Sequence, residues 1–362
     1  MYFIIACLLL FKSVFAQGQI PIMSRVGFGI GQIVEVKDIP VTEMDTQFGA
    51  GVSQEVKLKM TSGFDVGKVV DSNFTTQTVQ MKADIGQYYV VDKANIGDTP
   101  VYNIIDRYRL YPLAVLGIGF ILLVVFMAGK KGIGSLLGFA STLFVLVAYA
   151  APNLLAGKDP VFVAFMACGV IASLSMFLSH GVSRRTFLAY FSTMFLLVLS
   201  VGMSGLFVQV ANLTGAGTED AFFLASGSTA SINLRGVLLA GIIIGIMGVL
   251  DDITTAQTAA VDEIHKANPS LRGKELYLRG LSVGKEHIAS LVNTLMLAYA
   301  GASLPLFLLF NLNATSQPLW MMLNSEMIAE EIVRTLVGST ILVLAVPIST
   351  FIAALGVSRH RD

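Results

Sequence analysis

The chain is poor in cysteine, in tryptophan and in charge. Of its 362 residues, two are cysteines, one is a tryptophan and 13% are charged. Cys7 and Cys168 alone cannot build a disulfide framework or a cysteine-ligated metal site. The formal net charge of zero excludes a general electrostatic attraction to nucleic acid. Apolar residues, in contrast, make up 54% of the chain, and the mean hydropathy of +0.73 indicates a membrane protein.

Residues 1–16 have the features of a secretory signal peptide. Tyr2–Phe11 is an apolar core too short to span a bilayer, and the small residues of Val14-Phe15-Ala16 precede Gln17. A first anchoring helix is the alternative. Either reading places the segment that follows outside the cytoplasm.

Residues 17–105 predict a small β domain. Gly31–Lys37 and Gln54–Met60 alternate apolar and polar residues, as half-buried strands do. Further strand-like runs lie at Lys68–Val70, Val79–Lys82 and Gln87–Val91. About five short strands separated by turn residues are typical of a small β-barrel. Aromatic residues are sparse and lysines alternate with acids, so we expect a barrel for partners or gating rather than for nucleic acid.

Residues 106–358 predict a bundle of seven transmembrane helices. Each apolar run is long enough for the roughly 20 residues that a helix needs to cross a bilayer. The expected spans are 112–129, 133–153, 160–179, 187–210, 234–250, 288–310 and 335–356. Lysine and arginine gather on alternate loops, which puts the β domain outside and the tail at 359–362 in the cytoplasm.

The fifth expected span ends on two adjacent acids, Asp251 and Asp252. Gly241, Gly245 and Gly248 share one helix face before them and predict close helix packing. The loop charges put the acids at the cytoplasmic mouth of the span. A polar, uncharged stripe follows, made by Thr254, Thr255, Gln257 and Thr258. Charged groups near hydrocarbon are costly and usually functional, so the pair is a candidate ion, proton or gating site, with an ordinary interfacial helix end as the alternative.

Other polar residues could join this site from the sixth span. Glu286 and Asn293 are seven residues apart and share a helix face. Asp252, Glu286 and His287 lack a compact ligand spacing, so we expect no metal site, and no cofactor motif is present. On the outer side, Glu330 and Arg334 have the i, i+4 spacing of an ion pair.

Several motifs together resemble the YibE/F family of bacterial multi-pass membrane proteins. The resemblance runs in order from about Gly31 to Leu355. It implies a bacterial plasma-membrane protein with an extracytoplasmic N-terminal domain, it implies no reaction, and it favours Asp252 over Asp251. Asp262 departs from it, because the family has a bulky aromatic residue there. The motifs that carry it are Tyr-Asn-Ile-Ile-Asp106-Arg-Tyr-Arg109, Ser-His180-Gly-Val-Ser-Arg184-Arg185, Asn233-Leu-Arg235, Gly-Val-Leu-Asp251-Asp252, Val-Asn293-Thr294-Leu-Met-Leu-Ala-Tyr and Glu330-Glu331-Ile-Val-Arg334-Thr-Leu-Val-Gly.

Two functions remain open. The first is a transporter or export-linked channel component with Asp252 at its cytoplasmic mouth. The alternative is a non-catalytic scaffold that docks envelope or secretion partners through its β domain. We expect no enzyme, because adjacent acids on a helix diverge by about 100° and cannot form an aspartyl dyad alone. We expect the lipid bilayer to surround the helices, and the face formed by Gly241, Gly245 and Gly248 could also pack against a second copy of the chain in an oligomer.

Overall fold

A computed structural model describes residues 27–40, 52–76, 82–96, 99–227, 232–305, 308 and 318–358. The chain divides into two compact units, Met1–Leu123 and Val124–Asp362, and each is considered by itself. The predicted signal peptide at 1–16 and the predicted tail at 359–362 lie outside the described residues.

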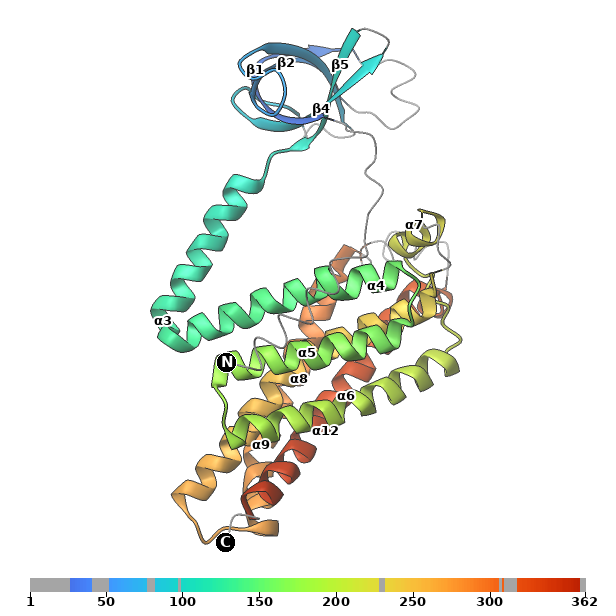
Figure 1. The fold of residues 1–362 in the computed structure, drawn as a ribbon. Helices are drawn as coiled ribbons and strands as arrows, with labels where there is room; N and C mark the ends of the chain where they lie inside the picture. Colours follow the sequence, from blue (N-terminus) through green and yellow to red (C-terminus); the bar gives the residue numbers. More distant parts are fainter. Residues whose placement is uncertain are drawn as a thin grey trace. The chain divides into compact units, whose positions relative to one another are not determined.

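The first unit contains an antiparallel five-stranded sheet that curls into a nearly closed barrel (Figure 1). Its strands pair in the order β3-β2-β1-β4-β5. The Ser72 hydroxyl on β3 donates a 2.7 Å hydrogen bond to the Tyr102 carbonyl on β5, which joins the two edge strands. The predicted small β-barrel is therefore confirmed. The strands are β1 (Gly27–Ile39), β2 (Val52–Ser62), β3 (Val69–Thr76), β4 (Tyr88–Ile96) and β5 (Thr99–Arg107).

The barrel core follows from the alternation in the sequence. On β2, Val56, Leu58 and Met60 are buried, while Glu55 before them and Lys59 between the last two are exposed. Four of the predicted runs overlap β1 to β4, whereas the run Val79–Lys82 corresponds to no described strand. Residues 77–81 lie outside the described residues, and Lys82 belongs to no strand. The fifth strand is β5, which the alternation missed because Pro100 and the neighbouring Ile104 and Ile105 interrupt it.

The described residues after the barrel are mainly helical. Helix α3 contains one residue with non-helical backbone angles, Gly129, and is followed directly by η2, a π-helical turn, and by α4. The helices are α3 (Leu110–Val145), η2 (Leu146–Ala150), α4 (Ala151–Leu155), α5 (Pro160–His180), α6 (Arg184–Val210), α7 (Glu219–Gly227), α8 (Leu234–Ala267), α9 (Gly273–Ala302), α11 (Leu319–Leu323) and α12 (Glu326–Ser358).

Five helices among the described residues are long and apolar enough to cross a membrane. The first of them, Leu110–Leu155, contains both expected spans 112–129 and 133–153, and it is kinked between them at Gly129, where φ is 56°. The expected span 288–310 is only partly described, since residues 306–307 and 309–317 lie outside the described part. The count of seven spans and their orientation therefore stay predictions, whereas the membrane-embedded helical unit is confirmed.

The core of the second unit lies among α5, α6, α8 and α12, which run side by side (Figure 1). Small residues allow these helices to approach closely: Ala164, Ala167 and Cys168 of α5 are completely buried. Large apolar side chains instead cover the outside, and Phe162 and Phe191 are more than 60% exposed. This distribution suits a bundle surrounded by lipid.

Candidate functional site

Helix α8 carries the acidic pair and the polar stripe in the centre of the bundle. The helix starts at Asn233, whose side chain caps it by accepting a 3.0 Å hydrogen bond from the Gly236 amide. It remains helical to Ala267, well past the acids. The pair is therefore not at a helix end, and the stripe beyond it belongs to the same helix.

Asp251 and Asp252 lie in different surroundings. Asp251 is half-buried, and the Ser175 hydroxyl of α5 donates a 2.5 Å hydrogen bond to its carboxylate. Asp252 is exposed, and no other described side chain forms a hydrogen bond with its carboxylate. Adjacent helical residues diverge by about 100°, which explains why only one of the two reaches α5. The Asp251 carboxylate thus enters the bundle, whereas that of Asp252 is accessible from its surface.

The polar stripe is packed inside the bundle. Thr254, Gln257 and Thr258 are each no more than 1% exposed. The hydroxyls of Thr254 and of Thr193 on α6 are 2.7 Å apart and share a hydrogen bond. The Gln257 amide donates to the Thr350 hydroxyl of α12 at 2.8 Å. Thr254 thus connects α8 to α6, and Gln257 connects it to α12, whereas the Thr258 hydroxyl donates to the Thr254 carbonyl within α8.

Two glycines of α9 make the Gln257 contact fit. The Gln257 amide also donates a 2.7 Å hydrogen bond to the Gly280 carbonyl. A Cβ atom at Gly280 would lie 2.8 Å from a Val261 methyl group, and one at Gly284 would lie 2.3 Å from a Val346 methyl group. The GxxxG spacing of these glycines lets α9 approach α8 and α12 closely.

Helix α6 extends the polar interior toward the other end of the bundle. Thr193, Ser200 and Ser204 lie on one face of α6, at spacings of seven and four, and all three are completely buried. The Ser200 hydroxyl donates to the Leu197 carbonyl at 2.8 Å. The buried Ser204 hydroxyl has no hydrogen-bond partner among the described residues, nor has that of Ser339 on α12. Buried hydroxyls without a partner are uncommon and need an explanation.

The other candidate residues of the cytoplasmic mouth do not contact the carboxylates of Asp251 and Asp252 through hydrogen bonds or ion pairs among the described residues. The Thr255 hydroxyl donates to the Asp251 backbone carbonyl at 2.7 Å, which is a contact within α8. Glu286 and Asn293 are exposed on α9, and no hydrogen bond or ion pair within the described part of the chain joins them to Asp251 or Asp252. Their participation in the site stays a prediction.

The glycine face of α8 is exposed. Gly241, Gly245 and Gly248 all lie on the surface of the single chain. A Cβ atom added to Gly241 or to Gly248 would meet nothing within 4 Å. Whether a second copy or lipid packs on this face is untested, so its role in helix packing stays a prediction.

The outer ion pair differs from the one predicted. Arg334 pairs with Glu331 at 3.1 Å, not with Glu330. The Glu330 side chain is buried, and its carboxylate accepts a 3.1 Å hydrogen bond from the Gly217 backbone amide. One turn earlier, Glu326 accepts from the Thr214 amide at 2.5 Å. Both carboxylates thus hold the loop after α6 onto the start of α12, because unpaired backbone amides are strong donors to carboxylates.

The family of the chain follows from a comparison with known proteins. The model of the YibE/F-like protein family matches residues 116–359, which is more than half of the chain. The chain belongs to the YibE/F-like family. The match covers most of the helical unit, including the acidic pair, the stripe and the outer carboxylates. No curated protein and no solved structure matches the chain.

Several site residues of this YibE/F-like chain were not identified from the sequence. Gly280 and Gly284 carried a readable signal, the GxxxG spacing within the sixth predicted span. Ser175 and Thr193 carried none, since hydroxyl residues are common in apolar helices. Only the packing of α5 and α6 against α8 singles them out.

Proposed function

We propose that the protein is a membrane transporter or an export-linked channel component that passes protons or small cations. The path runs along the facing polar surfaces of α6 and α8. Asp252 exchanges the ion at the exposed surface of α8, on its cytoplasmic side, and Asp251 receives it inside the bundle. The plasma membrane and the extracytoplasmic barrel are part of the same proposal.

The observation that carries the proposal is the buried polar line shared by α6 and α8. It consists of the Thr254–Thr193 contact, the half-buried Asp251 one turn earlier on α8, and Ser200 and Ser204 farther along α6. Apolar packing needs none of these groups, because burying a hydroxyl without a full set of partners costs free energy. Polar residues inside membrane helices are therefore typical of ion or proton pathways.

The line is tightly packed, so passage requires movement. Thr193 and Thr254 are completely buried and bonded to each other, which closes the path at that level. Opening it means separating α6 from α8 by enough to admit an ion or a chain of water. We therefore propose a gated path, with the Thr193–Thr254 contact as its narrowest point.

The test is ion flux in proteoliposomes under imposed proton, Na⁺ or K⁺ gradients, each followed with an enclosed dye that is sensitive to that ion. Asp251→Asn and Asp252→Asn should each abolish or strongly reduce the flux of the wild-type protein. Glu263→Gln is the matched control, because Glu263 is an exposed carboxylate of the same helix, paired with Lys266 outside the line. Wild-type flux in both Asn variants, or no flux of any of the three ions in the wild type, would contradict the proposal.

A scaffold function is the second candidate, and one feature of the barrel favours it. A hollow of about 430 Å³ opens on the first unit, with Phe28, Ile30, Val90 and Tyr108 among its lining residues. Phe28 is 60% exposed there, which suits an apolar partner segment. A photocrosslinker at Phe28 should then capture one defined envelope protein, and a crosslinker at the exposed Val66 should not. Identical capture from both positions would argue against this function.

A further inference from the structure

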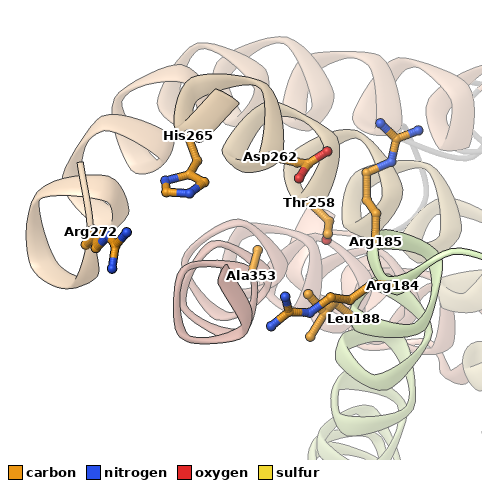
Figure 2. A pocket seen from close by; sticks show the side chains of 8 residues that line it. All are labelled: Arg184, Arg185, Leu188, Thr258, Asp262, His265, Arg272 and Ala353. Carbon is orange, nitrogen blue, oxygen red and sulfur yellow. The ribbon is translucent and has the colours of Figure 1, made fainter. Parts of the chain in front are cut away.

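A cavity of about 210 Å³ lies at the basic end of the bundle, where Thr258, one turn beyond Thr254 on α8, is among its lining residues (Figure 2). Its walls come from the start of α6, the last turns of α8 and α12, and the segment between α8 and α9. A water molecule occupies about 30 Å³ in the liquid, so the cavity has room for a larger polar group. The lining residues are Arg184, Arg185, Leu188, Thr258, Asp262, His265, Arg272 and Ala353.

The charge around this cavity is positive and uncompensated. Three arginines line it, Arg184, Arg185 and Arg272, and none forms an ion pair within the described ranges. The one carboxylate, that of Asp262, pairs with Lys266 at 2.8 Å. Lysine and arginine gather at membrane surfaces in any case. Here, however, Lys266 is satisfied by acids, while the three arginines around the cavity are not.

Two of the three arginines, Arg184 and Arg272, are held by backbone contacts that leave donors free. Arg184 donates to the Gly356 carbonyl at the end of α12. The Arg272 Nε atom lies 3.4 Å from the Pro269 carbonyl, so its terminal nitrogens remain available. A guanidinium presents five N–H donors in a planar fork, and one backbone contact uses only part of them.

His265 adds an imidazole ring to the wall. Its Nδ1 atom lies 3.0 Å from the Leu271 carbonyl, so this nitrogen carries the hydrogen when the bond is formed. The Nε2 atom of that tautomer is an acceptor, which can bind a hydroxyl of a singly or doubly protonated phosphate group. Figure 2 shows the His265 ring extending from α8 between that helix and Arg272.

We propose that this cavity binds a phosphate-bearing anion. Several arginines around one space favour a tetrahedral oxyanion, because guanidinium forks bind phosphate oxygens in pairs. The site would take either the headgroup phosphate of an anionic phospholipid or a soluble phosphate. Basic pockets between membrane helices on the cytoplasmic side are known to hold anionic headgroups. The proposal stands independently of any transport along α6 and α8.

The experiment uses the purified full-length protein and two probes. The first probe is phosphatidylglycerol in phosphatidylcholine nanodiscs, with bound lipid counted by native mass spectrometry. The second is inorganic phosphate, with binding measured as a shift in thermal stability. Arg185→Gln and Arg272→Gln should each weaken binding of the effective probe on the order of fivefold, and the double variant more. Lys274→Gln and Arg279→Gln are the controls, because both are exposed basic residues of α9 that do not line the cavity.

The two probes separate the two sources of phosphate. Retention of phosphatidylglycerol that inorganic phosphate cannot displace assigns the site to a lipid headgroup. A stability shift with inorganic phosphate, absent in Arg185→Gln, assigns it to a soluble phosphate. Folding of each variant is checked by its elution profile. The proposal is overturned if folded Arg185→Gln/Arg272→Gln protein binds both probes as the wild type and the controls do, or if neither probe binds the wild type.

Discussion

The barrel and the helical unit both have an apolar core, but they differ in what covers their outer surface. In the barrel, Val56 and Leu58 fill the interior, and ion pairs such as Lys57–Glu35 lie on the exposed surface. In the helical unit, large apolar side chains cover the outside, and hydroxyl and amide groups such as Thr254 and Gln257 are buried beside the apolar core. Water drives apolar groups inward in the first case, whereas lipid removes that drive in the second. The difference teaches that hydrogen bonds and close backbone approach, in addition to apolar packing, specify the helical interior.

The largest effect is expected in the barrel core. Leu58→Ala leaves a cavity among completely buried neighbours and should cost ~2–5 kcal/mol of barrel stability. Urea unfolding followed by hydrogen exchange of barrel peptides measures the loss. Val69→Ala, at a side chain that is 54% exposed on β3, is the control. Equal losses in the two variants would mean that the barrel interior does not depend on apolar burial.

Adding a single methyl group to a glycine of α9 should destabilise the helical unit where that helix packs closely. Gly284→Ala puts a Cβ atom 2.3 Å from a Val346 methyl group and should destabilise the unit by ~1–3 kcal/mol. Gly301→Ala on the same helix meets nothing within 4 Å, so it should be neutral or stabilising through helix propensity. Thermal unfolding in detergent distinguishes the two. The same sign of change for both would show that close approach of α9 is not required.

Removing the buried amide of Gln257 should cost a similar or smaller free energy of unfolding. Gln257→Leu removes its bonds to Gly280 and Thr350 and should cost ~1–3 kcal/mol, although leucine is more apolar. Gln209→Leu, at an exposed position of α6, serves as the control. A Gln257→Leu protein at least as stable as the wild type would show that these buried hydrogen bonds do not stabilise the helical unit.

The sequence predicted the kind of each unit better than its contacts. Alternation over Gln54–Met60 predicted a strand and its core positions, because a period of two residues is visible in the local sequence without knowing which strands pair with it. Apolar length predicted the membrane helices for the same reason. Strand β5 was missed because its pattern is broken at Pro100. A local sequence pattern is thus sufficient to predict an element when each face of that element meets a single environment, such as water, lipid or the protein interior.

Predictions that depend on a partner were weaker. The spacing of Glu330 and Arg334 predicted an ion pair, yet Arg334 pairs with Glu331, because Glu330 is occupied by the Gly217 amide. That amide comes from a loop more than a hundred residues away, which no helical spacing reveals. The contact of Ser175 with Asp251 likewise depends on the packing of α5 against α8.

The smallest expected effect concerns a charged group of the barrel. Hydrogen bonds from Lys68, Lys93 and Tyr102 hold the pKa of the Asp65 carboxyl well below its usual range. A lowered folded-state pKa stabilises the barrel above the unfolded value of about 3.9, and this stabilisation is lost as the pH falls through the folded value. Asp65→Asn should therefore reduce the protection of barrel amides from hydrogen exchange at pH 7, and this reduction should become progressively smaller below pH ~4.

Hydrogen exchange of the barrel peptides, corrected for the intrinsic pH dependence of exchange, measures this effect. Glu35→Gln is the control, because its ion pair with Lys57 is solvent-exposed on both sides. Exposed ion pairs contribute little, so this change should be nearly silent. An Asp65→Asn effect that stays constant from pH 7 to pH 3 would contradict the assignment.

The central claim is that ions pass between α6 and α8, and a reversible lock at the Thr193–Thr254 contact tests it most directly. Thr193→Cys and Thr254→Cys are combined in a Cys168→Ala background, and disulfide formation is verified by mass spectrometry. Their hydroxyl oxygens are 2.7 Å apart, which favours a bridge between the two helices. We predict that oxidised protein in proteoliposomes carries no proton or cation flux and that reduction restores it. Equal flux from the locked and the reduced protein would contradict the claim.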